Sequence, residues 1–336
     1  MTFADLDISC AFPASVAAAD HIARAERLGF RRAWVYDSPG LYPDVWMVLA
    51  LAADRTETIG LGPAVLVPSL RHPLVNAAAI ATLAEQAPGR VAVAIGSGFT
   101  GRMVLGQRPM RWADVAEYVR ALRALLRGEE VEWDGGVLQM LHGPGFGAAR
   151  PVDVPILVGA DGPKGLAVAE ELAEGVFSAG VPQTDGVGPS WRALLVFGTV
   201  LDEGEGATSR RARAASAPAL AVVVHALYER GGPAAIEGFP GGKAWLDAIE
   251  AVPERSRHLA IHEGHLAVPN ERDTLVDMSE FAEAFTFTGS AEQLRGRLAD
   301  LKSTGVTEIA YQPAGPDILR ELEAFAAMAE IRGGLR

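Results

Sequence analysis

Short runs of branched aliphatic residues alternate with longer, alanine-rich amphipathic stretches along most of this 336-residue chain. The short runs have the length of strands, and the stretches between them follow helical periodicity. Parallel strands need helical connections of about a dozen residues, so this alternation favours a parallel α/β sheet. We predict strands at 5–12, 31–37, 58–68, 90–96, 155–160, 175–180, 192–202 and 308–313. Eight such units predict a closed (β/α)8 barrel, whose active sites lie at the carboxyl ends of the strands.

Two segments break this alternation. Residues 130–140 contain an Asp-Gly pair between alternating flanks, which predicts a small hairpin. Residues 203–285 are too long for an ordinary connection between the seventh and eighth strands. We interpret residues 1–336 as a single domain in which 203–285 form a helical insertion, and insertions of this length in barrels often cover the catalytic face as lids.

Composition excludes several classes of function. Hydrophobic residues make up 49% of the chain, yet no run approaches the roughly 18 apolar residues of a membrane helix. A net charge of −12 argues against nucleic acid or an anionic membrane as the main partner. Acidic residues stand where a secretory signal would be basic, and the lone Cys10 cannot form an internal disulfide. We therefore expect a soluble, cytoplasmic protein with a small-molecule substrate.

The run Gly96-Ser97-Gly98-Phe99-Thr100-Gly101 matches the dinucleotide-binding pattern G-x-G-x-x-G. A Rossmann loop must open directly into a helix, with an acidic residue at the end of a second strand about 20 residues later. Here no periodic helix is evident before Trp112, and the acids at that distance lie inside the helix. We therefore reject the Rossmann interpretation. Glycines at a barrel strand end can instead let a ring or phosphate approach the backbone, or they can simply shape a tight turn.

A second glycine-rich turn precedes a predicted helix. Gly162-Pro163 begins this helix, and the free N–H groups and positive dipole end of a helix N-terminus suit an anion. The simpler alternative is that Gly159, Gly162 and Gly165 only shape the turn between strand and helix.

Four stretches of the chain carry a resemblance to a known family. They are GFRRAWVYD, the long run from DVWMVLALAADR to VAVAIGSG, PILVGADGPKGLAVAEELAEGV, and FTFTGSAEQLRGRLADLKSTGVTEIAYQP. Together they resemble the bacterial-luciferase-like flavin and deazaflavin oxidoreductases, and within them the branch that uses coenzyme F420. The resemblance covers about two thirds of the chain and is weakest in 203–285. It implies a TIM barrel, commonly a homodimer, that binds its cofactor at the strand ends.

The resemblance also implies roles for particular residues. Ala64-Val65 falls where the family has a non-proline cis peptide against the deazaflavin ring. The polar tail of the cofactor would pass Gly96, Ser97 and Gly98. The phosphate would bind the segment composed of Gly159, Ala160, Asp161, Gly162 and Pro163.

Two departures from the family pattern restrict the reaction. Members that oxidise sugar phosphates have a histidine and a glutamate where this chain has Ser38 and Phe99. Without that acid and base the chain is not expected to oxidise a sugar hydroxyl. We expect hydride transfer between F420 and another small organic substrate. An FMN-dependent monooxygenase and a non-catalytic flavin-binding protein are the alternatives.

Candidate catalytic residues fall at the second strand end and in the insertion. Tyr36 and Asp37 end the strand, and Ser38 follows. The alternative for Tyr36 is a packing role, and the alternative for Asp37 is capping of the loop that carries Ser38. His258, His262 and His265 lie in RHLAIHEGHL, where an imidazole would orient substrate, act as an acid, or only hold the loop. We assign catalysis to Asp37, Ser38, His262 and His265, and the substrate pocket to Tyr36, Phe99 and His258. Because no cysteine or H-E-x-x-H run accompanies these histidines, and Glu263-Gly264 interrupts the helix, we expect no metal.

Overall fold

The computed structural model describes residues 5–180 and 188–331. Eight parallel strands form one sheet in the order β3-β2-β1-β12-β9-β8-β7-β4. They are β1 (Asp7–Phe12), β2 (Arg32–Val35), β3 (Gly60–Pro63), β4 (Val93–Gly96), β7 (Ile156–Gly159), β8 (Gly175–Ser178), β9 (Trp191–Phe197) and β12 (Glu308–Gln312). Parallel bridges from Leu61 to Val91 and from Leu66 to Ile95 join the two edge strands. The predicted eight-stranded barrel is therefore confirmed.

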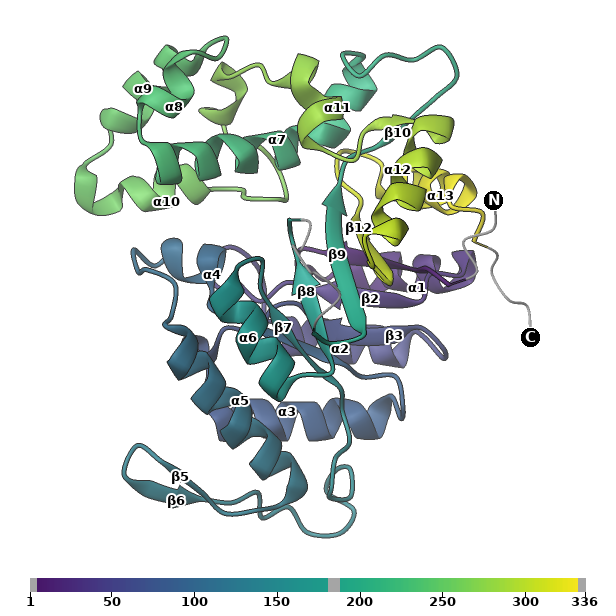
Figure 1. Cartoon of the computed structure of the whole chain (residues 1–336), viewed down its shortest axis with the longest axis vertical. Coiled ribbons are helices and arrows are strands. Elements are labelled where there is room, and N and C mark those ends of the chain that lie inside the picture. Colours follow the sequence, from purple (N-terminus) through teal and green to yellow (C-terminus); the bar gives the residue numbers. More distant parts are fainter. Residues whose placement is uncertain (1–4, 181–187, 332–336) are drawn as a thin grey trace.

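Helices surround the barrel and cover its outer face (Figure 1). They are α1 (Ala18–Leu28), α2 (Val45–Asp54), α3 (Pro73–Gln86), α5 (Trp112–Arg127), α6 (Pro163–Leu172), α12 (Ala291–Ser303) and α13 (Ile318–Met328). Helix α1 ends at Gly29 in the left-handed conformation (φ 95°), which a glycine adopts without steric cost. Helix α2 begins just after Pro43, because the Asp44 carboxylate accepts the N–H groups of Trp46 and Met47.

The predicted hairpin is present as β5 (Val131–Trp133) paired antiparallel with β6 (Gly136–Leu138). Its two central residues, Asp134 and Gly135, both have positive φ. This is the backbone that a type I′ turn requires.

The predicted seventh strand is interrupted. It divides at Gly198 (φ 145°) into β9 and the short β10 (Val200–Leu201), which pairs with β11 (Gly289–Ser290). A Cβ on Gly198 would lie 2.4 Å from the carbonyl carbon of Phe287, so the close approach of these backbones requires glycine.

The chain between β10 and β11 is helical and has its own apolar core. It contains α7 (Arg210–Gly231), α8 (Ala234–Glu237), α9 (Gly242–Glu250), α10 (Arg257–His262) and α11 (Ala282–Phe285), with 3-10 turns at Glu254–Ser256, Asp273–Leu275 and Ser279–Phe281. Val224, Ile236, Trp245 and Ile249 are buried in a cluster separate from the barrel core. Figure 1 shows these helices, in green, beyond the carboxyl end of β9.

One expectation about the glycine run is wrong. A short helix, α4 (Phe99–Met103), begins directly after Gly98, where no helix was expected before Trp112. Five residues are too few to show helical periodicity, and tertiary contacts hold the turn. Arg102 donates to the Ser69 hydroxyl at 2.5 Å and to the Arg108 carbonyl at 2.6 Å. The Rossmann interpretation still fails, because the glycines follow a strand of a closed barrel.

Within the described residues, no helix combines the length and apolarity needed to cross a bilayer.

Candidate active site at the carboxyl ends of the strands

A bulge follows β3 on the rim of the barrel. The Ala64–Val65 peptide bond is cis, which confirms the conformation predicted for this position. The Ala64 N–H donates to the Val35 carbonyl at 2.9 Å. Pairing with the neighbouring strand resumes at Leu66, whose N–H donates to the Ala94 carbonyl at 2.7 Å and whose carbonyl accepts from Gly96 at 2.9 Å. Residues 64 and 65 are therefore held on both sides by backbone hydrogen bonds.

The Val65 side chain explains two of the predicted cofactor-binding glycines. A Cβ on Gly96 would lie 2.8 Å from Val65 Cγ2, and a Cβ on Gly159 would lie 2.5 Å from Val65 Cγ1. Gly98 has φ 81°, and a Cβ there would lie 2.4 Å from Val67 Cγ1. The first two glycines therefore admit Val65 between adjacent strands. The roles of Gly96, Ser97 and Gly98 in binding a cofactor stay predictions.

The turn before α6 presents a different surface. Gly162 is the residue before the helix, and a Cβ there would meet no atom within 4 Å. Asp161, Gly162, Pro163 and Lys164 are all exposed, so the N-terminus of this ten-residue helix is open to an anion.

Asp161 and Ala160 already have partners in this turn. The Asp161 carboxylate accepts the N–H groups of Ala179 at 3.1 Å and Gly180 at 2.9 Å, the two residues directly after β8. Ala160 is buried, and its N–H donates to the Phe177 carbonyl at 3.0 Å. These contacts give both residues a structural role, and any contact with a cofactor stays a prediction.

Asp37 is buried at the end of β2 and is committed to an ion pair. Arg71 donates to its carboxylate at 2.5 Å and to that of Asp44 at 2.7 Å. Burial raises the pKa of the Asp37 carboxyl above its ordinary value, and the hydrogen bond from Arg71 opposes that rise. No sequence signal marked Arg71 as the partner of Asp37, from which it is 34 residues distant.

Tyr36 belongs to a chain of hydrogen bonds between the rim and the insertion. Its hydroxyl donates to the Gln312 side chain at 2.7 Å, and Gln312 donates to the Leu266 carbonyl at 2.7 Å. Tyr42 donates to the neighbouring His265 carbonyl. Sequence reasoning missed Tyr42 and Gln312, although Gln312 ends a predicted strand and that position was a usable signal.

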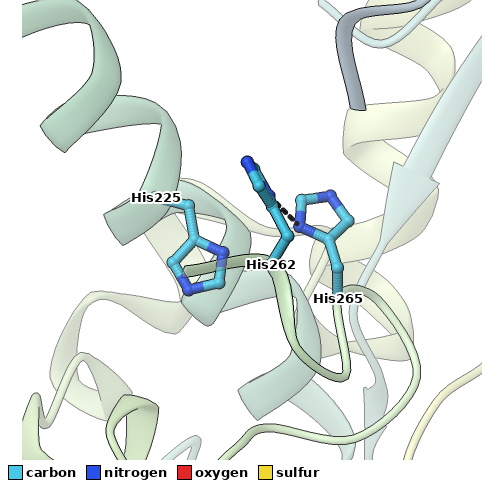
Figure 2. Close-up of side chains that lie close together, drawn as sticks. All are labelled: His225, His262 and His265. Carbon is cyan, nitrogen blue, oxygen red and sulfur yellow. Dashed lines mark hydrogen bonds between the residues drawn. The ribbon is translucent and has the colours of Figure 1, made fainter. Parts of the chain in front are cut away.

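Only two of the three histidines predicted from the sequence lie together in the structure. His262 and His265 are buried together, and the partner that completes their cluster is His225 of α7 (Figure 2). His258 lies apart, with its ring near Gly106. Burial lowers the pKa of the His265 imidazole well below its ordinary value, and His225 and His262 add to this effect. His225 was missed because a lone histidine in an apolar helical run carries no distinguishing pattern.

Helix α4 lies between the two groups of predicted catalytic residues. Ser38 Oγ is 3.3 Å from the position of a Cβ on Gly101, while the adjacent Thr100 hydroxyl lies 3.3 Å from His265 Nε2. Phe99 is 38% exposed, and the Arg230 guanidinium of α7 lies 5.7 Å from its ring centroid. The structure thus brings Ser38 and His265 to the same short helix, without showing a direct contact between them.

The family of the chain follows from a comparison with protein-family models. Residues 13–308 match the family described as luciferase-like monooxygenase. The chain belongs to this family. It is therefore an oxidoreductase.

Curated relatives of this luciferase-like protein include two kinds of enzyme. The 5,10-methylenetetrahydromethanopterin reductase of Archaeoglobus fulgidus is 28% identical over 318 residues, which cover 90% of this chain and 91% of the reductase. The F420-dependent glucose-6-phosphate dehydrogenase of Intrasporangium calvum is 26% identical over 336 residues, covering 94% of each chain. Among solved structures, an F420-dependent secondary alcohol dehydrogenase in complex with an F420-acetone adduct superposes with a TM-score of 0.66 at 20% identity, over all of both chains.

Proposed function

We propose that this protein is a coenzyme F420-dependent oxidoreductase that transfers a hydride between the deazaflavin and a small organic substrate. The observation that carries the proposal is the backbone bulge at Ala64 and Val65, whose Val65 side chain lies between Gly96 and Gly159 at the strand ends. Two relatives of this chain are named for F420, which supports the same cofactor here.

The residues of the rim fit such a group. The space beside Gly96 and Gly159 holds the Val65 side chain, so a flat ring there meets Val65 and Ala64, whereas at Gly162 the cofactor meets backbone alone. Above Gly162 there is open space next to a helix N-terminus, where a phosphate is stabilised by N–H groups and the helix dipole. We assign the ring to Ala64 and Val65, the tail to Ser97 and Gly98, and the phosphate to Gly162 and Pro163.

The bound deazaflavin supplies a carbon that donates or accepts a hydride, and the protein supplies orientation and exclusion of water. In this proposal residues 203–285 act as a lid. Its support is that Tyr42, Gln312 and Thr100 on the barrel side bind His265 and Leu266 of that segment. Tyr36 and Phe99 border the substrate pocket.

Asp37 and Ser38 act differently in the proposal. Asp37 positions the rim through Arg71, because its carboxylate is already bound to that side chain. Ser38 offers a hydroxyl that can hydrogen-bond to a substrate oxygen, and no histidine is present there to take a proton from a sugar hydroxyl.

A side-by-side titration with F420 and FMN tests the proposal. We expect saturable quenching of F420 fluorescence by the wild-type protein and weaker binding of FMN. Gly162→Asp should weaken F420 binding about tenfold, because it places a negative charge beside the phosphate, an effect near 1.4 kcal/mol.

The matched control is Gly296→Asp, which adds the same charge on exposed helix α12, where a Cβ also meets no atom within 4 Å. It should leave binding unchanged. Binding of FMN without affinity for F420 would overturn the proposal. Such a result, with oxygen uptake in the presence of reduced FMN and a substrate, would favour a monooxygenase, as the family description suggests.

A further inference from the structure

Three buried histidines come together inside the 203–285 segment. His225 lies on α7, His262 ends α10, and His265 follows in the next turn. Their exposed fractions are 1%, 1% and 3%, and one nitrogen of each ring lies within 4.8 Å of the others. Figure 2 shows a nitrogen of His225 on the side that faces the other two rings.

The carboxylate of Asp273 determines which nitrogen of His225 carries the hydrogen. Its Nε2 lies 2.8 Å from Asp273 Oδ1. An ionised carboxylate only accepts, so Nε2 carries the hydrogen and the neutral ring has a bare lone pair at Nδ1. That Nδ1 is buried without a hydrogen-bond partner. A buried lone pair without a donor is costly unless something else occupies its position.

The other two rings have different outer neighbours. His262 Nε2 lies 2.8 Å from Glu229 Oε1 but is buried without a hydrogen-bond partner, whereas His265 Nε2 lies 3.3 Å from the Thr100 hydroxyl. Their Nδ1 atoms share a hydrogen bond at 3.4 Å, and its hydrogen must leave when both nitrogens bind one ion. The three Nδ1 atoms thus lie on the inner side of the cluster, and a carboxylate or hydroxyl lies near each Nε2.

We propose that His225, His262 and His265 bind a divalent transition metal of the zinc type through their Nδ1 atoms. Two nitrogens at about 2.05 Å from a tetrahedral ion lie about 3.35 Å apart, which the His262–His265 pair already matches. One nitrogen of His225 lies within 4.8 Å of the other two rings and must move closer to bind the same ion. Three protein ligands leave the fourth position to water, and imidazole suits Zn²⁺, Co²⁺ and Ni²⁺.

The carboxylates complete the site from outside. Asp273 orients the His225 ring through Nε2 and makes its Nδ1 a better ligand, as carboxylates behind metal-bound histidines do, and the Glu229 carboxylate lies beside His262 Nε2. Their two negative charges also offset the charge of the ion. Because the ligands lie on α7 and on the turn that contacts Thr100 and Tyr42, the ion fixes that turn against α7. This site does not depend on the proposed use of F420, and it revises the sequence-based expectation of no metal.

Cobalt binding tests the site without any assay of activity. Full-length protein is stripped with a chelator and titrated with Co²⁺, which gives intense visible bands only in a tetrahedral or five-coordinate nitrogen site. We expect bands that saturate at one Co²⁺ per chain and disappear when one equivalent of Zn²⁺ is added. Absence of such bands in the folded wild-type protein would overturn the proposal.

Two variants and a matched control locate the ion. His225→Gln keeps an N–H that can reach Asp273 but lacks the imidazole nitrogen, so it should weaken Co²⁺ binding more than 100-fold. Asp273→Asn should weaken it about 10- to 100-fold. The control His258→Gln changes a histidine outside the cluster and should bind as the wild type does.

Equal losses in His258→Gln and His225→Gln would contradict the site. If His225→Gln does not fold, the wild-type spectrum and its displacement by Zn²⁺ decide the question alone.

Discussion

Trp34 donates its indole N–H to Glu308 Oε1 at 2.8 Å. Both side chains lie inside the barrel and are at most 1% exposed. Trp191 donates to the other oxygen at 2.5 Å. The Arg32 guanidinium lies over both indole rings, at 5.3 and 4.9 Å from their centroids. These residues belong to β2, β9 and β12, so one buried carboxylate joins three strands at the end opposite the candidate site.

Removing this carboxylate should destabilise the barrel strongly. Glu308→Ala leaves two indole N–H groups without their acceptor and the mostly buried Arg32 guanidinium without a nearby negative charge, which should cost about 2 to 5 kcal/mol in the free energy of unfolding. Urea denaturation measures the change. Glu323→Ala, which removes an exposed ion pair with Arg24, should change the free energy by less than about 0.5 kcal/mol. Equal effects would mean that Glu308 is not a buried cross-link.

The contact of Val65 with Gly159 predicts a coupled pair of substitutions. Gly159→Ala places a methyl group where Val65 Cγ1 now lies, and overpacking of this kind should cost about 1 to 3 kcal/mol. Adding Val65→Ala should remove the clash and recover part of that loss. A double-mutant cycle in urea should therefore give a favourable coupling of about 0.5 to 3 kcal/mol. Strict additivity of the two changes would contradict the contact.

The hydroxyl of Tyr42 should control the mobility of the turn at His265. Tyr42→Phe removes the donor to the His265 carbonyl and keeps the ring, so it should cost about 0.5 to 1.5 kcal/mol. Amide hydrogen exchange followed by mass spectrometry should show faster exchange in residues 263–268 and unchanged exchange in the hairpin 131–138. A uniform rise across the whole chain would instead indicate global destabilisation.

The barrel could be predicted from the sequence because its signals are local. Each strand is a short aliphatic run, and stops such as Gly29 and turns such as Asp134-Gly135 act within a few residues. The resemblance to luciferase-like enzymes added the cis bond at Ala64–Val65, which neither composition nor periodicity indicates. Helix α4 was missed because contacts from Ser69 and Arg108, and not its own five residues, hold it in place.

The candidate site depends on contacts between residues far apart in the chain. Asp37 and Arg71 are 34 residues apart, and Thr100 and His265 are 165 apart. Nothing near His225 in the sequence distinguishes it from other helix residues. Its association with His262 and His265 depends on how α7 packs against α10, so only the structure could add it to the cluster.

The ion pair of Glu205 with Arg211 predicts how stability falls in acid. Burial opposes ionisation of this carboxyl, but hydrogen bonds from Arg211, Ser209 and the Asp202 N–H outweigh it and lower the pKa of Glu205 from 4.5 to about 2. Because the folded pKa is the lower one, the pair stabilises the protein above pH 4.5, and this contribution is lost between pH 4.5 and pH 2. The melting temperature of the wild-type protein should thus be higher than that of Glu205→Gln at pH 7, and this difference should shrink steadily below pH 4.5. Glu203→Gln changes an exposed neighbouring carboxylate and should have the melting temperature of the wild type at every pH. A gap between wild type and Glu205→Gln that stays constant from pH 7 to pH 3 would show that Glu205 acts through shape and not through its charge.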